Sequence, residues 1–375
     1  VYKTNNKWQL LSFYFAIGCG VLTKGPVAIG LPGLAALIFL FTQRDFKWKT
    51  IWRLQPFGGL LLALLISVPW FYAVHVETDG AWTQEFFFKH NFSRFSDSME
   101  GHSGSPLLTF AFVFGLGMLA FIPFSVQSFK NAWKERKDSA MMYVLISASV
   151  IVVFFAISST KLPNYTVPSY PLITILIGAY IAKIDNQWFA NLGNRIGLFF
   201  YAILLIGFPV GIYFGLKGDK SLSELTNLAF YFIPLSVVGI FILKQGIARK
   251  NIESVLWMNI SVWCVTIMLF FHLIFPQVDG QNPVRQTLPE MDTSKTIIAF
   301  KRLNPAFVFA LKREIPMYND VETIKQIMGS QPSGYLISRT EFQEELEAIP
   351  GLEFQDKARD LFENPTTLVM KWGMD

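Results

Sequence analysis

Long apolar segments, each followed by a short polar or charged stretch, occupy the first three quarters of the chain. A helix that spans a membrane needs about 20 predominantly apolar residues. Nine segments approach this length, so we predict that they cross a membrane. They lie at residues 8–22, 26–42, 57–74, 107–129, 140–157, 166–183, 195–215, 227–244 and 254–275. The pattern therefore predicts an all-α, polytopic membrane region over residues 1–276.

The C-terminal quarter, residues 277–375, follows a different pattern, which is typical of a small α/β domain. Short β-prone or alternating runs predict strands, and wider apolar spacing predicts helices. The candidate strands are 296–300, 305–311, 334–338 and 366–372, and the candidate helices are 321–328 and 340–348. This region has no histidine, no cysteine and no phosphate-binding loop. We therefore interpret it as an accessory domain rather than a catalytic one.

Composition and charge agree with this division. Hydrophobic residues make up 52% of the 375 residues and charged residues only 16%, whereas a soluble domain carries about 25% charged residues. These values exclude a disordered chain, a coiled coil and an ordinary soluble enzyme. Residues 1–276 carry 21 basic and 12 acidic side chains, and residues 277–375 carry 11 and 15. Membrane topology explains the basic excess, so no nucleic-acid partner is predicted.

The basic residues alternate between loops in the way that membrane insertion requires. If the nine segments all span, one set of loops holds 15 Lys and Arg residues and the other holds six. Cytoplasmic loops carry such an excess. The first set is therefore assigned to the cytoplasm, together with Val1. The domain at 277–375 is then expected on the exoplasmic side.

The longest predicted exoplasmic loop, about residues 75–105, contains an aromatic-rich segment with candidate chemistry. His90 and Arg94 are four residues apart, so they share one face if the segment is helical. An imidazole and a guanidinium on one face can bind a phosphate group or a metal ion. An interfacial helix whose polar side chains simply face water explains the same pattern.

Two shorter exoplasmic loops each offer a cation. Lys24 lies in the break between the first two predicted spans, and Lys161 and Tyr165 flank Pro163 after the fifth. A loop stiffened by proline can direct an ammonium and a hydroxyl group to one anion. The simpler alternatives are a Lys24 side chain that extends from a helix end to the membrane surface, and a Lys161 that caps the sixth span.

Five motifs, taken in order, carry a resemblance to a known class of enzyme. They are Leu22–Ala28, Pro69–Phe71, Phe87–Phe95, Gly101–Pro106 and Ser158–Tyr165. The ordered set, which covers about residues 8–183, resembles the integral-membrane glycosyltransferases of the lipid A aminoarabinose transferase and protein O-mannosyltransferase type. No single motif is specific by itself.

The resemblance implies a GT-C-like helix bundle in a bacterial inner membrane, with the C-terminal domain in the periplasm. Enzymes of this type transfer a sugar from a polyprenyl phosphate to a lipid or protein acceptor at the exoplasmic face. The motifs imply that Lys161, Tyr165 and Arg94 bind the donor phosphate, with Lys24 a further candidate. His90 matches a histidine that binds a divalent metal in some members. Cations would stabilise the departing phosphate.

The catalytic carboxylate of these enzymes has no counterpart in the matched motifs. It belongs to the first exoplasmic loop, whereas the first such loop predicted here, residues 23–26, contains no carboxylate. We therefore expect that the chain begins about four helices into the enzyme, that the catalytic aspartate precedes Val1, and that the chain alone is inactive. Glu85 and Asp97 are the alternatives within the chain.

Two other functions remain open at the level of sequence. A transporter or flippase for a lipid-linked sugar would need charged or polar side chains within its spans, and the predicted spans contain almost none. A non-catalytic membrane scaffold would explain the domain at 277–375. It would not explain the cations and hydroxyl groups of the exoplasmic loops.

Overall fold

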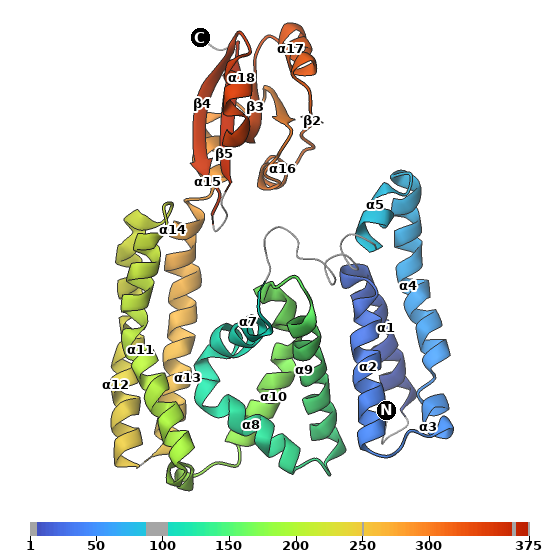
Figure 1. Ribbon diagram of the computed structural model, residues 1–375, viewed down its shortest axis with the longest axis vertical. Helices are drawn as coiled ribbons and strands as arrows, with labels where there is room; N and C mark the ends of the chain where they lie inside the picture. The colour runs from blue at the N-terminus through green and yellow to red at the C-terminus, as the bar shows by residue number, and fades with distance from the viewer. Residues whose placement is uncertain (1–5, 88–103, 250, 362–364, 374–375) are drawn as a thin grey trace. The chain divides into compact units, whose positions relative to one another are not determined.

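The computed structural model describes residues 6–87, 104–249, 251–361 and 365–373 (Figure 1). The chain forms two compact units. The first contains Val1–Tyr201 and Gln245–Glu253, and the second contains Ala202–Lys244 and Ser254–Asp375.

The first unit begins with a helical hairpin and a returning helix. Its elements are α1 (Lys7–Lys24), α2 (Val27–Thr42), α3 (Trp48–Arg53), α4 (Pro56–Glu77) and α5 (Ala81–Gln84). Gly25 ends α1 with a φ of 66°, a left-handed conformation that favours glycine. Glycines also let α1 and α4 approach closely, because a Cβ atom on Gly18 would lie 2.9 Å from Ile66 and 3.2 Å from Ala63.

The remainder of the first unit is a group of broken helices. Its elements are α7 (Pro106–Phe110), the π-helix η2 (Ala111–Gly117), η3 (Leu119–Phe121), α8 (Ile122–Lys134), α9 (Ser139–Ile157), η4 (Pro163–Ser169), α10 (Tyr170–Ile181) and η5 (Asn186–Ala190). The chain bends by 81° between Pro106–Gly117 and Leu119–Lys134. Ala35, Phe39 and Leu40 of α2 pack against Met142 and Ile146 of α9, which joins the two parts of the unit.

Helices, three of which begin or end in the first unit, form the start of the second unit. They are α11 (Leu192–Gly218), η6 (Ser223–Phe232), α12 (Ile233–Ala248), α13 (Ile252–Leu269), η7 (Phe270–Ile274) and α14 (Phe275–Asp279). Within this unit, Gly239 of α12 approaches the backbone of Ala202 on α11. Ser236 donates a hydrogen bond of 2.8 Å to the carbonyl oxygen of Ile206. These contacts allow α11 and α12 to pack at short range.

A five-stranded mixed sheet follows α14. The strands are β1 (Thr296–Phe300), β2 (Met317–Tyr318), β3 (Gly334–Arg339), β4 (Leu352–Arg359) and β5 (Thr366–Trp372), in the order β2-β1-β3-β5-β4. β1 pairs in parallel with β2 and β3, whereas β5 is antiparallel to β3 and β4. The helical elements are α15 (Pro283–Thr287), η8 (Leu288–Glu290), α16 (Ala306–Leu311), α17 (Val321–Ser330), η9 (Thr340–Phe342) and α18 (Gln343–Glu347).

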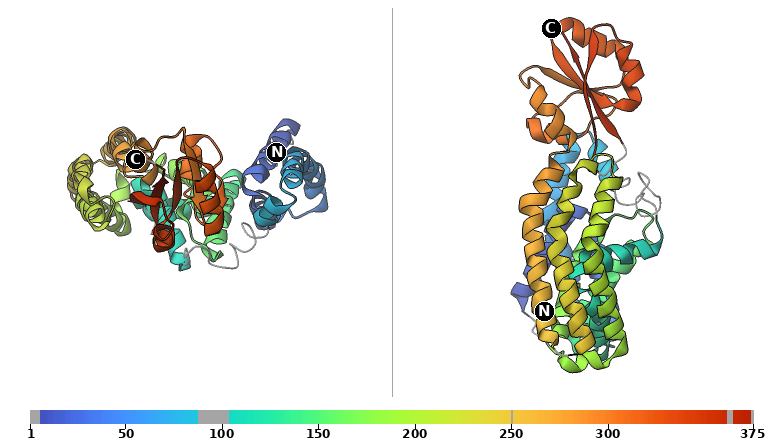
Figure 2. Two further views of the ribbon diagram at one scale, coloured as in Figure 1. Left: turned by 90° about the horizontal axis from the view of Figure 1, so that it is seen from above. Right: turned by 90° about the vertical axis from the view of Figure 1, so that its left-hand side faces the viewer.

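Helices cover both faces of this sheet, as the right-hand view of Figure 2 shows. Successive side chains of a strand point to opposite faces. Ile298 and Phe300 therefore pack with α17 and α18, whereas Ile297 and Ala299 pack with α15 and α16. A burial pattern of this kind fixes the register of β1, because a shift by one residue would exchange the two faces.

Helices occupy all nine predicted spans, but the number of spans stays a prediction. Five helical segments of the described chain are long and apolar enough to cross a membrane, and the bent pair at Pro106–Lys134 would make six. The five are Trp48–Glu77, Ser139–Ile157, Leu192–Gly218, Ser223–Ala248 and Ile252–Asp279. The other three predicted spans correspond to α1, α2 and α10, which have 18, 16 and 12 residues.

The candidate strand at 305–311 is wrong, because these residues form the helix α16. The Asn304 side chain accepts a hydrogen bond of 3.0 Å from the backbone amide of Ala306, which favours a helical start. Lys312 ends the helix in a left-handed conformation. The apolar run from Ala306 to Leu311 has a spacing that fits both a helix and a strand. The residues that flank it, Asn304 and Lys312, therefore decide its structure.

Candidate functional site

Lys24 and Tyr165, which come from distant parts of the first unit, lie in contact. The Nζ atom of Lys24 is 5.0 Å from the centroid of the Tyr165 ring, within the range of a cation–π interaction. Lys24 is the exposed last residue of α1, and Tyr165 lies in the 3₁₀ helix η4. The Tyr165 ring also contacts Phe155 of α9, with the two ring centroids 5.3 Å apart. The structure therefore brings two of the predicted phosphate-binding residues together.

Lys161 is held by the end of the helix that precedes it. Its side chain is 6% exposed, and its Nζ atom donates hydrogen bonds to the carbonyl oxygens of Ala156, at 3.1 Å, and Ser158. The last carbonyl groups of a helix lack partners within the helix and carry partial negative charge. Lys161 thus caps the C-terminal end of α9, the fifth predicted span, and not the sixth. Burial lowers the pKa of the Lys161 ammonium.

Polar side chains fix the shape of the η4 turn that carries Tyr165. Thr166 donates a hydrogen bond of 2.9 Å to the carbonyl oxygen of Pro163. The hydroxyl groups of Thr166 and Tyr170 lie 3.0 Å apart, and that of Tyr170 donates to the carbonyl oxygen of Phe112 at 3.4 Å. No motif in the sequence pointed to Thr166 or Tyr170. Their spacing of four residues beside Tyr165 was the available signal.

The C-terminal end of the long loop lies beside Lys161. A Cβ atom on Gly104 would be 3.4 Å from Cγ of Lys161 and 2.8 Å from the Leu108 side chain. Ser105 caps α7 by accepting a hydrogen bond of 3.3 Å from the amide of Leu107. Thr109 of α7 donates to the carbonyl oxygen of Phe155, at 3.3 Å. The loop thus ends against the residues that support Tyr165 and Lys161.

The N-terminal end of the long loop carries a cluster of aromatic side chains. They are Trp70, Phe71, Trp82, Phe86 and Phe87, with the Trp82 and Phe86 rings stacked at 4.7 Å. The close approach of Gly18 to Ala63 and Ile66 sets the register between α1 and α4, which run in the same direction. Six residues further along α1, Lys24 therefore lies at the level of Trp70 on α4.

Several candidates of the sequence analysis lie outside the described residues. Arg94, His90 and Asp97 fall within 88–103, so their roles stay predictions. Glu85, the other alternative carboxylate, is exposed at the end of the α5 segment. Among the residues that the structure describes, no group of three or more His, Cys, Asp or Glu side chains could hold a metal ion. The described part of the site therefore offers cations and hydroxyl groups, which suit an anionic ligand.

The arrangement of helices and sheet matches that of two solved structures. The chain superposes on the crystal structure of ArnT from Cupriavidus metallidurans bound to undecaprenyl phosphate with a TM-score of 0.70 and 22% identity, over 97% of this chain and 69% of that one. The apo structure of the same protein gives a TM-score of 0.73, with 20% identity. The chain thus shares the fold of ArnT.

Sequence comparison agrees with the fold. An undecaprenyl phosphate-α-4-amino-4-deoxy-L-arabinose arabinosyl transferase of Pseudomonas paraeruginosa is 34% identical over 307 residues, which are 78% of this chain and 52% of that protein. A second transferase of this name, from Pseudomonas fluorescens, is 29% identical over 61% of this chain and 40% of its own length. No protein-family model matches the chain.

These findings confirm the resemblance that the motifs predicted. The chain is related to the aminoarabinose arabinosyl transferases in sequence and shares the fold of ArnT. It spans about half the length, or less, of the curated relatives it matches.

Proposed function

We propose that the protein takes part in the transfer of an aminoarabinose-type sugar from undecaprenyl phosphate to a lipid A-like acceptor at the exoplasmic membrane surface. The relationship to the arabinosyl transferases supports this activity. The observation that carries it for this chain is the contact of Lys24 with the Tyr165 ring, because the contact brings an exposed cation next to a half-buried residue that bears a hydroxyl group.

Lys24 and Tyr165 are the proposed principal contacts to the donor phosphate. Hydrogen bonds from charged donors to a phosphate are about twice as strong as neutral ones. As the sugar leaves, the polyprenyl phosphate gains negative charge, and a fixed ammonium near it lowers the barrier. Arg94 is proposed to add a guanidinium from the long loop.

Lys161 is assigned a supporting role in the same site. Its ammonium is engaged by two backbone carbonyl groups at the end of α9. It therefore fixes the backbone between α9 and η4 and adds positive charge four residues before Tyr165. Because this charge is buried, it is screened less by water than that of an exposed lysine.

His90 is the proposed ligand of a divalent metal ion, as the resemblance implies. Among the described residues, no group of three or more His, Cys, Asp or Glu side chains could hold a metal ion. We therefore assign no step of the reaction to a metal ion.

Sugar transfer tests the proposed activity. The gene that encodes this chain, expressed at full length in bacteria without their own aminoarabinosyl transferase, is expected to increase the mass of lipid A by one aminoarabinose residue. Mass spectrometry of extracted lipid A provides the measurement, and the Lys24→Ala variant serves as the matched control. Unmodified lipid A from cells whose membranes contain the protein would contradict the assignment of donor and acceptor.

We also propose that residues 277–375 lie on the periplasmic side of a bacterial inner membrane. In a background with Cys19 and Cys264 replaced, Glu353→Cys on β4 is expected to react with a membrane-impermeant maleimide in intact cells. Lys137→Cys, in the turn between α8 and α9, is expected to react only after lysis. Both side chains are exposed, so access to the protein surface does not differ. Equal labelling of both positions in intact cells would contradict the topology.

A further inference from the structure

A groove separates the first turns of α1 and α4, at the end of α1 opposite to Lys24. Its volume is about 420 Å³, which lies in the range of ligand-binding cavities. The lining residues include Lys7, Leu11 and Tyr14 from α1, and Gln55, Gly58 and Leu62 from the segment that begins α4. The walls are mostly apolar, and the lysine lies at the start of α1.

Gly58 and Gly59 explain why the groove is open although α1 and α4 are in close contact next to it. A Cβ atom on Gly59 would lie 2.2 Å from the Tyr14 ring, so α1 and α4 touch there. A Cβ atom on Gly58 would meet nothing within 4 Å. Tyr14 is held in place by the hydrogen bond of 2.8 Å that its hydroxyl donates to the carbonyl oxygen of Leu54. The groove is therefore a fixed feature of the packing.

Exposed tryptophans mark the level at which the groove opens. Trp8, beside Lys7, is 77% exposed, and Trp48 and Trp52 of α3 are 68% and 51% exposed. The Trp52 ring packs 5.7 Å from Phe57, next to Gly58. Tryptophans gather at the level of lipid headgroups in membrane proteins. The mouth of the groove thus lies at a headgroup layer, and its apolar walls extend toward the hydrocarbon core.

We propose that this groove binds one anionic phospholipid of the cytoplasmic leaflet. Lys7 contacts the headgroup phosphate, and one acyl chain lies along Leu11 and Leu62. The charge of the surroundings favours an anionic headgroup, because α3 adds Lys49 and Arg53 to the same membrane surface. The site is separate from the sugar-donor site, since Lys7 and Lys24 are roughly 25 Å apart along α1 at 1.5 Å per residue.

Native mass spectrometry of the purified protein, with phosphatidylglycerol and phosphatidylcholine added in equal amounts, tests the proposal. The wild type is expected to retain one phosphatidylglycerol in preference to phosphatidylcholine. Lys7→Ala is expected to reduce this preference about fivefold, because it removes the headgroup contact. Gly58→Leu is expected to abolish retention, because its side chain fills the groove.

Gly33→Leu is the matched control for the substitution at Gly58. Gly33 is an exposed helical glycine of α2, and a Cβ atom there also meets nothing within 4 Å. This variant is expected to retain the lipid as the wild type does. Equal retention by Gly58→Leu and Gly33→Leu would overturn the proposal, as would equal retention of the two lipids by the wild type. Displacement of the lipid by glycerol phosphate alone would also overturn it, because the acyl chain would then contribute nothing.

Discussion

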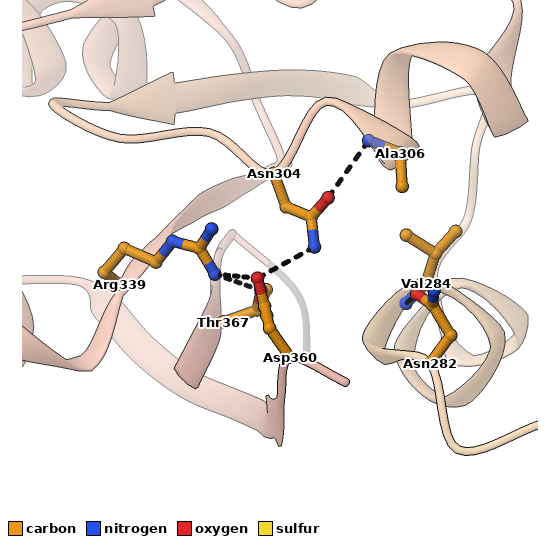
Figure 3. Close-up of polar contacts among 7 residues, drawn as sticks. All are labelled: Asn282, Val284, Asn304, Ala306, Arg339, Asp360 and Thr367. Carbon is orange, nitrogen blue, oxygen red and sulfur yellow. Dashed lines mark hydrogen bonds and ion pairs between the residues drawn. The ribbon is translucent and has the colours of Figure 1, made fainter. Parts of the chain in front are cut away.

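The Asp360→Ala substitution is expected to destabilise the C-terminal sheet by about 3–5 kcal/mol, the cost of removing one partner of a buried ion pair. The Asp360 carboxylate is 5% exposed and accepts hydrogen bonds from Arg339, from Thr367 at 2.6 Å and from Asn304 at 3.1 Å (Figure 3). Alanine would leave the Arg339 guanidinium without its counter-charge. The loss is a large part of the 5–15 kcal/mol that stabilises a typical domain.

The position of Asp360 explains why the effect should reach the whole sheet. Arg339 ends β3, Thr367 lies in β5, and Asp360 directly follows β4. One carboxylate therefore connects three adjacent strands and, through Asn304, the start of α16. Hydrogen exchange of the β3, β4 and β5 amides in the purified protein measures the effect, and faster exchange on all three strands is expected.

Glu345→Ala provides the control for the loss of an ion pair. Glu345 pairs with Lys301 at 2.6 Å, but the two side chains are 40% and 30% exposed. Exposed ion pairs contribute about 0–1 kcal/mol, so this variant should exchange almost as slowly as the wild type. Similar exchange rates in Asp360→Ala and Glu345→Ala would show that the buried network does not hold the sheet together.

The regular part of the fold could be predicted where a run of residues has one clear character along its length. β1 has the predicted bounds, 296–300, since all five residues are apolar or β-branched and four are buried. β4, residues 352–359, was missed. It is an edge strand in which Glu353, Asp356 and Lys357 interrupt the alternation, and a bulge shifts its register. Pairing with β5 decides its structure, and no local pattern reports such pairing.

The candidate site could be predicted only as a set of residue types. The motifs selected Lys24, Lys161 and Tyr165, but the contact between Lys24 and Tyr165 depends on how α2, which follows α1, packs against α9. The role of Lys161 as a cap of α9 depends on the backbone path after Ile157, which spacing alone does not fix. Arg94 and His90 lie outside the described residues, so their predicted roles rest on the resemblance.

Lys24→Ala is expected to weaken the binding of undecaprenyl phosphate by roughly ten- to a hundredfold. Loss of a hydrogen bond from a charged donor costs about 1.5–3 kcal/mol, and 1.4 kcal/mol corresponds to tenfold in affinity. Titration of the detergent-solubilised protein with the lipid measures the change. Tyr165→Phe keeps the ring below the Lys24 ammonium and removes only the hydroxyl group, so a smaller loss is expected than for Tyr165→Leu.

A second lysine–tyrosine pair of the chain separates a specific site from a general effect of charge. Lys217 lies 5.9 Å from the Tyr213 ring on α11, in another predicted exoplasmic position, and it is also exposed. Lys217→Ala should therefore leave lipid binding unchanged. If Lys24 and Tyr165 contact one phosphate, the double variant Lys24→Ala/Tyr165→Leu should lose less than the sum of the single losses. Equal binding by Lys24→Ala and Lys217→Ala, with both proteins folded, would remove Lys24 from the phosphate site and leave Arg94 and Lys161 as its proposed cations.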